Sequence, residues 1–228
     1  MSYTHMWDEM RERDPEHSAR YAQRWRDLAA QGLDLDGEAR FVDALAERGS
    51  RILDAGCGTG RVGGYLAERG HEVVGVDLDD YLIAEAQETY PGADWYVGDL
   101  ARFDFAALDE GRDMRDLGAH ASTDLLGRPE AAPESDRPGF DVIVSAGNVM
   151  TFLDPASRSA VMGNLAGALR PDGRLVCGFG AGRGYDFDDF DADLAAAGLT
   201  LIQRFSTWTL RPFTDPGDFL VAIATPGR

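Results

Sequence analysis

The chain has few cysteines, no lysine and no long apolar run, and each of these features excludes some classes of protein. Two cysteines in 228 residues, Cys57 and Cys177, cannot supply the bridges of a small secreted scaffold, so we expect reduced thiols in a cytoplasm. No apolar run reaches the length of a membrane span or of a signal-peptide core. The sequence therefore predicts a cytoplasmic protein with no membrane partner.

Positive charge is scarce as well. All 22 basic residues are arginines and stand against 40 acidic residues, which gives a formal net charge of -18. A surface this acidic repels phosphate backbones, so we expect neither a nucleic-acid partner nor an anionic lipid surface. The sequence also offers no metal-ligand cluster and no catalytic triad.

The most informative segment that is present covers residues 51–60, Arg-Ile-Leu-Asp-Ala-Gly-Cys-Gly-Thr-Gly. A short apolar strand breaks here into three alternating glycines, which lets a ligand approach the backbone closely. The next residues, 61–70, are predicted to form a helix whose N-terminus adds N–H groups and a positive dipole end. Asp54 at the strand tip brings a carboxylate to the same cleft. The segment predicts a site for a nucleoside-like ligand.

Two families share such a turn. Residues 58–63 fit the dinucleotide-binding pattern G-x-G-x-x-G, which is weak when it stands alone. The longer string that starts at Asp54 resembles motif I of the class I S-adenosylmethionine-dependent methyltransferases. A carboxylate at Asp54 would repel a pyrophosphate and attract the ammonium group of a methionine moiety. We therefore favour the methyltransferase interpretation over a nicotinamide-dependent oxidoreductase.

Later segments resemble the same family over roughly residues 40 to 225. A strand ending in Asp77 lies about twenty residues after the turn, where a carboxylate accepts hydrogen bonds from both ribose hydroxyls. The resemblance places Asp99, at the end of the next strand, near the adenine amino group. Residues 140–148 resemble motif IV, and residues 169–176 resemble the turn that enters the fifth strand.

The order of predicted elements indicates the fold. Strands are expected at 51–55, 72–77, 94–98, 140–146 and 173–179, with helices near 61–69, 80–88, 155–169 and 187–197. Such alternation predicts an α/β doubly wound, mostly parallel sheet. Two consecutive strand-like runs, 199–210 and 218–225, predict a C-terminal antiparallel hairpin, so that the whole forms a seven-stranded Rossmann-like methyltransferase fold.

We expect a single methyltransferase domain over residues 1–228. Amphipathic helices at 5–31 and 37–48 are predicted to form an N-terminal lid within residues 1–48. Residues 106–139 lack sustained periodicity and predict a flexible insertion between the third and fourth strands. Whether this insertion is a plain surface loop, a lid or a contact in a homodimer is left open.

The resemblance also assigns individual residues. The donor, S-adenosyl-L-methionine, is expected to contact Asp54, Ala55, Gly56, Cys57, Gly58, Thr59, Gly60, Asp77, Leu78, Gly98, Asp99, Leu100, Ala146, Gly147, Trp25 and Arg26. Tyr21 and Arg24 are alternatives on the same N-terminal helix. We interpret Cys57 as a packing choice, since the sequence pairs it with no base.

The reacting groups are harder to place. Asn148 is the candidate catalytic residue near the sulfonium, and its alternative role is to form a turn after Gly147. Among the histidines, His71 and His120 are interpreted as surface residues, and His5 and His17 as plausible bases on the lid.

The expected reaction is an SN2 methyl transfer to an O, N, S or C nucleophile of a small molecule, which requires mainly alignment of the reactants and exclusion of water. Candidate acceptor contacts are Arg183, Tyr185, Trp208, Arg211 and Phe213, which could equally pack the edge hairpin. A non-catalytic protein that binds S-adenosylmethionine or S-adenosylhomocysteine is the remaining alternative.

Overall fold

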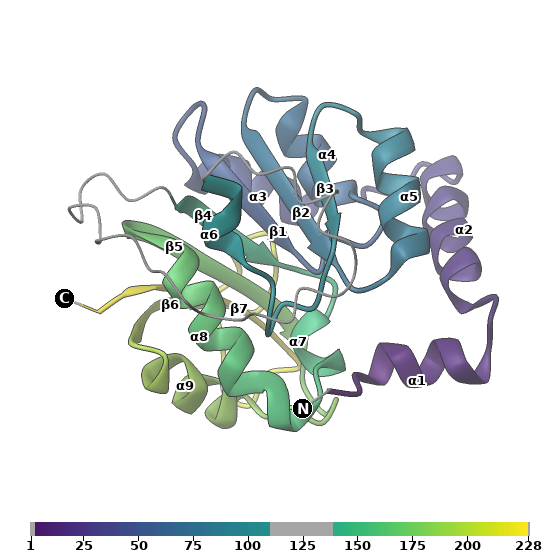
Figure 1. Cartoon of the computed structure of the whole chain (residues 1–228). Helices are drawn as coiled ribbons and strands as arrows, with labels where there is room; N and C mark the ends of the chain where they lie inside the picture. The colour runs from purple at the N-terminus through teal and green to yellow at the C-terminus, as the bar shows by residue number, and fades with distance from the viewer. Residues whose placement is uncertain (1–2, 110–138, 228) are drawn as a thin grey trace, which may run out of the picture.

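A seven-stranded sheet organises the computed structural model, which describes residues 3–109 and 139–227 (Figure 1). The strands lie in the order β3-β2-β1-β4-β5-β7-β6. The first five pair in parallel, and β7 lies antiparallel between β5 and β6. The bounds are β1 Arg51–Ala55, β2 Glu72–Asp77, β3 Asp94–Val97, β4 Phe140–Ser145, β5 Leu169–Gly180, β6 Leu199–Phe205 and β7 Phe219–Pro226. The predicted doubly wound sheet with a C-terminal hairpin is confirmed.

Helices cover both faces of the sheet, as expected when parallel strands alternate with helices. One core joins the sheet to residues of α3 and α4, and another joins it to residues of α6, α8 and α9. The bounds are α1 Met6–Arg13, α2 His17–Ala30, α3 Gly37–Leu45, α4 Arg61–Ala67, α5 Asp80–Thr89, α6 Phe105–Asp109, α7 Val149–Phe152, α8 Arg158–Ala168 and α9 Phe187–Ala196, with a 3-10 turn at Pro155–Ser157.

The N-terminal segment differs from the single helix predicted over residues 5–31. It forms α1 and α2, which are separated at Pro15. The residue before a proline avoids the helical region, and Asp14 is extended, with φ -148° and ψ 94°. The break lets α1 lie beside α7 (Figure 1), where the ring of Trp7 packs 5.7 Å from that of Phe152.

Among the strands, two boundaries differ most from the prediction. Strand β5 begins at Leu169, earlier than the predicted 173, because it includes the turn that enters it. Strand β6 ends at Phe205, and the chain then turns, with the Ser206 N–H donating to the Arg211 carbonyl. The insertion predicted over residues 106–139 falls mostly outside the described residues, although α6 includes its first positions.

The parallel strands bring the predicted site residues to one edge. Strand β1 lies between β2 and β4, with Asp54 opposite Gly75 on one side and Val144 on the other. The chain runs outward from β1 to β2 and β3 and then crosses back to β4 on the other side of β1, which makes the gap beyond the carboxyl ends of β1 and β4 the topological switch point. None of the described helices is long and apolar enough to cross a membrane.

Candidate functional site

The turn after β1 adopts a backbone that its glycines permit. Gly56, Gly58 and Gly60 have φ values of 81°, 54° and 76°, in the left-handed region that side chains disfavour. A Cβ on Gly56 would lie 2.4 Å from a methyl carbon of Val149, so this position also requires a glycine for packing. The Gly58 N–H donates to Asp77 Oδ2 at 2.8 Å, which ties the turn to the end of β2.

A cleft enclosing about 680 Å³ opens beside this turn. The end of β2, the segments that follow β1 to β4, the N-terminal segment, α5 and α7 contribute to its wall. The lining residues are His5, Trp7, Tyr21, Gly56, Gly58, Asp77, Leu78, Leu82, Gly98, Asp99, Leu100, Gly147, Val149, Phe152 and Leu153. An apolar wall with a few carboxylates suits a flat base joined to a ribose.

A smaller cavity of about 410 Å³ lies around the other side of the turn. It is lined by Tyr21, Trp25, Asp54, Gly56, Cys57, Thr59, Arg61, Val62, Ala146, Gly147 and Val149. Four residues, Tyr21, Gly56, Gly147 and Val149, line both cavities. The two cavities therefore adjoin at the glycine turn, and we call them together the trough; the first is larger and more apolar.

Two carboxyl groups with raised pKa values flank the turn. Asp54 is 2% exposed and accepts a hydrogen bond from the Gly63 N–H at 2.8 Å. Burial raises its pKa to about 7, and burial likewise raises the pKa of Asp77 to about 6. Asp77 accepts from the N–H groups of Gly58 and Asp79, which partly offset that rise. A bound cation or hydroxyl donor would favour the ionised forms.

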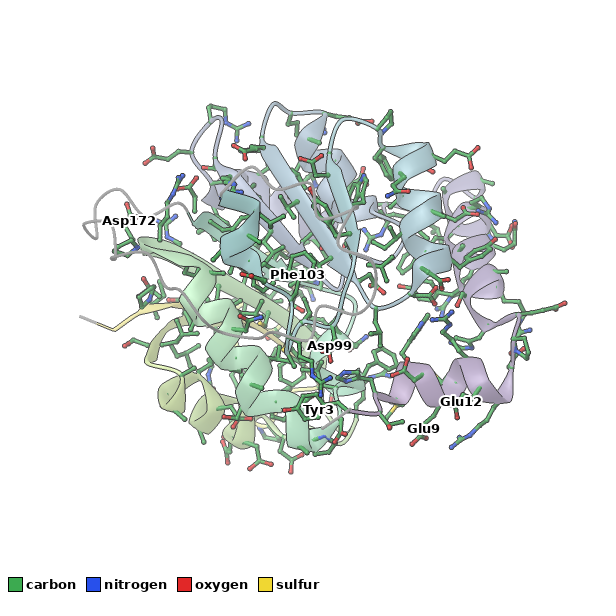
Figure 2. The ribbon with its side chains drawn as sticks, viewed as in Figure 1. Tyr3, Glu9, Glu12, Asp99, Phe103 and Asp172 are labelled. Carbon is green, nitrogen blue, oxygen red and sulfur yellow. The ribbon has the colours of Figure 1, made fainter. Side chains whose placement is uncertain are left out.

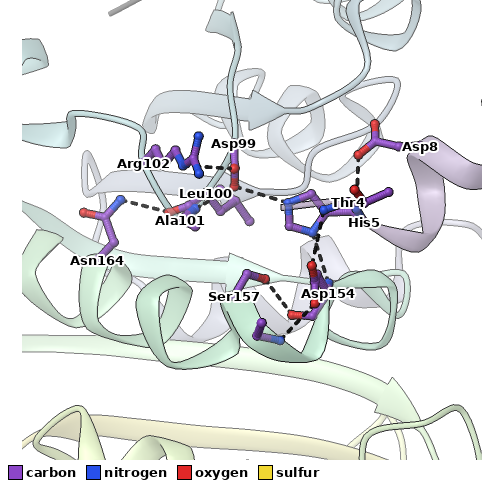
Figure 3. A network of polar contacts seen from close by, with 11 residues as sticks. Thr4, His5, Asp8, Asp99, Leu100, Ala101, Arg102, Asp154, Ser157 and Asn164 are labelled. Carbon is purple, nitrogen blue, oxygen red and sulfur yellow. Dashed lines mark hydrogen bonds and ion pairs between the residues drawn. The ribbon is translucent and has the colours of Figure 1, made fainter. Parts of the chain in front are cut away.

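A third carboxylate, Asp99, is held by the N-terminal segment (Figure 3). Its Oδ1 lies 3.4 Å from Nε2 of His5 and accepts from the Ala101 N–H at 2.9 Å. Burial opposes ionisation of Asp99, but the bonds from His5 and Ala101 outweigh it and lower its pKa. The same pairing raises the pKa of His5.

A fourth carboxylate, Asp79, fastens both N-terminal helices to the sheet. The side chain is fully buried and accepts from Trp7 Nε1 at 2.7 Å and from the Ser18 hydroxyl. It also caps α5 by accepting from the N–H groups of Tyr81 and Leu82. Sequence reasoning missed this role: an Asp before a helix signals an N-cap, but nothing local signals partners on α1 and α2.

Figure 2 shows how the N-terminal helix is oriented. Glu9 and Glu12 on α1 point to solvent, and Asp99 lies beside the segment that precedes this helix. Trp7, on the opposite side of α1, lines the cleft. The sequence signal that could have found it is an aromatic residue among the charged residues of a short helix.

Most predicted donor contacts line the trough. Thirteen do so: Trp25, Asp54, Gly56, Cys57, Gly58, Thr59, Asp77, Leu78, Gly98, Asp99, Leu100, Ala146 and Gly147. Ala55 and Gly60 do not, since Ala55 is buried in the sheet and Gly60 caps α4. Arg26 pairs instead with Glu85 on α5, and the structure does not bring it to the trough.

Several lining residues were not predicted. They are Trp7, Arg61, Val62, Leu82, Val149 and Phe152, which come from the helices around the trough, and Leu153, which follows α7. In the sequence, nothing distinguishes these residues from ones that only pack a helix. Tyr21, one of the alternatives on the N-terminal helix, lines both cavities.

The predicted catalytic residue, Asn148, is the N-cap residue that precedes α7, with φ 67°. Its Oδ1 accepts from the Gly180 N–H at 2.8 Å, which ties the end of β4 to the end of β5. Its neighbours Gly147 and Val149 line the trough, whereas Asn148 itself does not. The catalytic role stays a prediction, and the turn-forming role matches its geometry.

The five predicted acceptor contacts are not gathered at one place. Tyr185 is fully buried, stacks on Phe179 and donates to Asp193. Trp208 packs against Phe41, in the core on the α3 side of the sheet. Phe213 packs against Phe187, and neither Arg183 nor Arg211 lines either cavity. The alternative, that these aromatic residues pack the sheet and its hairpin, fits the structure.

The histidines also separate. His71 is buried, 5% exposed, and its Nε2 lies 3.0 Å from Asp43, so its interpretation as a surface residue is wrong. The hydrophobic strand that follows it draws it into the core. His17 packs edge-on against Trp7 and does not line the cleft. His120 lies outside the described residues.

The thiols are structural. Both cysteines are buried, and burial raises the pKa of Cys57 well above its usual value and that of Cys177 to about 12. Each thiol therefore stays protonated at neutral pH, and Cys57 is no nucleophile.

A glycine turn and a strand-end carboxylate at the switch point of a doubly wound sheet with a C-terminal hairpin define a Rossmann-like nucleoside-binding protein. Residues 53–175 match the sequence profile of a family described as "Methyltransferase domain". A solved TehB-like SAM-dependent methyltransferase from Corynebacterium glutamicum is 46% identical, with a TM-score of 0.77, over 93% of this chain and 100% of that one. The chain therefore belongs to the S-adenosylmethionine-dependent methyltransferase family.

Curated relatives match over shorter stretches. The magnesium-protoporphyrin O-methyltransferase of Rhodobacter capsulatus is 37% identical over 108 residues, 39% of this chain and 47% of that enzyme. The demethylmenaquinone methyltransferase of Beutenbergia cavernae is 35% identical over 81 residues, 35% of this chain and 34% of that enzyme. The match thus spans less than half the length of these relatives.

Proposed function

We propose that this chain transfers the methyl group of S-adenosyl-L-methionine to a small molecule. The observation that carries the proposal is the pair of adjoining cavities around the glycine turn, one larger and apolar and the other smaller and more polar. Adenosine fits the larger end, with its ribose hydroxyls at Asp77 and its base beside Asp99. The methionine moiety fits the smaller end, beside Asp54 and Arg61.

In this arrangement the methyl group lies near the residues shared by both cavities, beside Tyr21 and Val149. The lone pair of the acceptor attacks the methyl carbon, the carbon–sulfur bond breaks with its electron pair going to sulfur, and S-adenosylhomocysteine remains. Because the donor is activated by its own positive charge, the protein contributes to catalysis mainly by aligning the reactants and excluding water.

The N-terminal helices would act as a lid over the donor. Trp7 and Tyr21 form part of the cleft wall, and the buried Asp79 holds both helices against α5. Donor entry and product release then require these contacts to loosen, as lids do in other enzymes.

A small acceptor is supported by the charge of the chain and by the names of two relatives. A net charge of -18 disfavours an RNA substrate, and the two named curated relatives are methyltransferases of a porphyrin and of a menaquinone precursor. Another curated match, to the 18S rRNA (guanine-N(7))-methyltransferase of Bos taurus, covers 22% of this chain. The test must therefore include RNA.

The purified chain is incubated with methyl-labelled S-adenosylmethionine in two separate arms. One arm contains a metabolite extract and the other contains total RNA. We expect label in one or a few small molecules, detected by mass spectrometry, and none with the Asp77→Ala variant. Label in the RNA arm would refute the small acceptor. Donor binding by the wild type without product in any arm would indicate a non-catalytic binding protein.

A further inference from the structure

Asp99 lines the cleft, and within residues 3–109 and 139–227 only one of its two oxygens has a close side-chain or backbone partner. Its Oδ1 takes both near contacts, from the Ala101 N–H at 2.9 Å and from His5 Nε2 at 3.4 Å. Among the described residues, the nearest partner of Oδ2 is Arg102 Nε, at 4.0 Å. Two partners on one oxygen fix the plane of the carboxylate and leave the other oxygen able to accept from a ligand.

The second ring nitrogen of His5 identifies the tautomer. Nδ1 lies 3.1 Å from the backbone nitrogen of Asp154, which can only donate. Nδ1 is therefore the acceptor, and the proton of the neutral ring is on Nε2, directed at Asp99. With both nitrogens engaged by the protein, His5 has no lone pair to offer an acceptor molecule, which argues against its predicted role as a base.

His5 is itself held in place on both sides (Figure 3). The side chain is 6% exposed, and its backbone N–H donates to Asp8 Oδ2 at 3.2 Å. The preceding Thr4 N–H donates to the Asp154 carboxylate at 3.2 Å. The start of α1 is thereby joined to the segment after α7, and His5 bridges that junction to the end of β3.

We propose that His5 is a positioning residue for recognition of the donor's base: it orients Asp99 so that Oδ2 accepts the hydrogen bond of the adenine amino group. This inference rests on the proposed function, because it assumes that adenine binds beside Asp99. It adds that selectivity for an amino-bearing purine depends on the N-terminal segment, 94 positions before the carboxylate in the chain.

A purine with a carbonyl oxygen in place of the amino group tests this directly. Such a base would face Asp99 with an acceptor, and two acceptors repel. The probes are S-adenosylhomocysteine and S-inosylhomocysteine, with dissociation constants measured by calorimetry. We expect the wild type to prefer the adenosyl ligand at least about tenfold, and His5→Ala to lose most of that preference.

Two further variants separate positioning from general loss of packing. His5→Gln keeps an N–H donor for Asp99 and a carbonyl acceptor for Asp154, so it should restore a preference within about threefold of the wild type. His17→Ala removes the other histidine of the N-terminal helices, which does not line the cleft, and should keep the wild-type ratio. Melting temperatures of all variants show whether each one folds.

The outcomes decide between the claims. If His5→Ala folds and keeps the wild-type ratio of the two constants, the positioning role is wrong, although the donor site stands. If the wild type binds neither ligand, the proposed function and this inference both fall. If the wild type prefers the adenosyl ligand and His5→Ala loses that preference, the inference holds whether or not an acceptor is methylated.

Discussion

Donor binding should depend steeply on pH, because two carboxyl groups of the trough must ionise for it. The pKa values of Asp54 and Asp77 are raised to about 7 and about 6 in the empty site. At pH 5 about one hundredth of the first group and about one tenth of the second are ionised. If the bound donor requires both charges, its dissociation constant should be about a thousandfold higher at pH 5 than at pH 7.5, or about 4 kcal/mol.

Isothermal titration calorimetry with S-adenosylmethionine tests this in two ways. The logarithm of the dissociation constant should fall with slope two below pH 6, with slope one between 6 and 7, and level off above. At pH 6.5, titrations in buffers of different ionisation enthalpy should show release of about one proton per donor bound. A constant that is flat from pH 5 to 7.5 would refute the reasoning.

Matched variants assign each step. Asp77→Asn should weaken binding and leave only the titration step near pH 7. The dissociation constant of this variant should then change about a hundredfold between pH 5 and 7.5. Asp54→Asn should leave only the titration step near pH 6, so that the dissociation constant changes about tenfold over the same range. The turn should keep its structure in this variant, because the amide oxygen can still accept from the Gly63 N–H. An unchanged two-step profile in either variant would show that the residue is not one of the titrating groups.

The same shifts predict the stability of the empty protein. A carboxyl whose folded pKa exceeds its unfolded value stabilises the fold below that unfolded value and loses this contribution as pH rises through the folded pKa. The melting temperature without donor should therefore fall between pH 5 and 7.5, and the increase caused by added donor should grow over that range.

Two further predictions concern the turn and the lid. Gly58→Ala should weaken donor binding at least about tenfold. The control is Gly70→Ala, which carries the same positive-φ cost of roughly 1 kcal/mol in open space and should not weaken binding. Equal dissociation constants for the two variants, measured by calorimetry, would contradict the close approach of the ligand at Gly58. Trp7→Phe keeps an aromatic side chain but removes the 2.7 Å hydrogen bond to Asp79. Amide hydrogen exchange in α1 should therefore become faster, and the free energy of donor binding should weaken by about 1–3 kcal/mol. The melting temperature should change little. Affinity and exchange both equal to the wild type would mean that α1 is no lid.

Much of the fold could be predicted because its signals are local. Strands β1, Arg51–Ala55, and β2, Glu72–Asp77, have the bounds that their patterns predict. The break at Pro15 was missed because apolar spacing on either side of a proline still resembles one helix. The aromatic residues Tyr185 and Trp208 were candidates for an acceptor site, but they pack on separate cores.

The sequence by itself determined the glycine turn, the acids at the strand ends and the order of strands and helices along the chain. These depend on backbone conformations and side-chain periods that span a few residues, so a single chain displays them openly. Only the tertiary structure decided which residues surround the ligand. Trp7 meets Asp79 across 72 positions and His5 meets Asp154 across 149, because packing of the N-terminal segment against the switch point brings them together. No local pattern specifies such pairs, since they depend on how distant elements bury their surfaces.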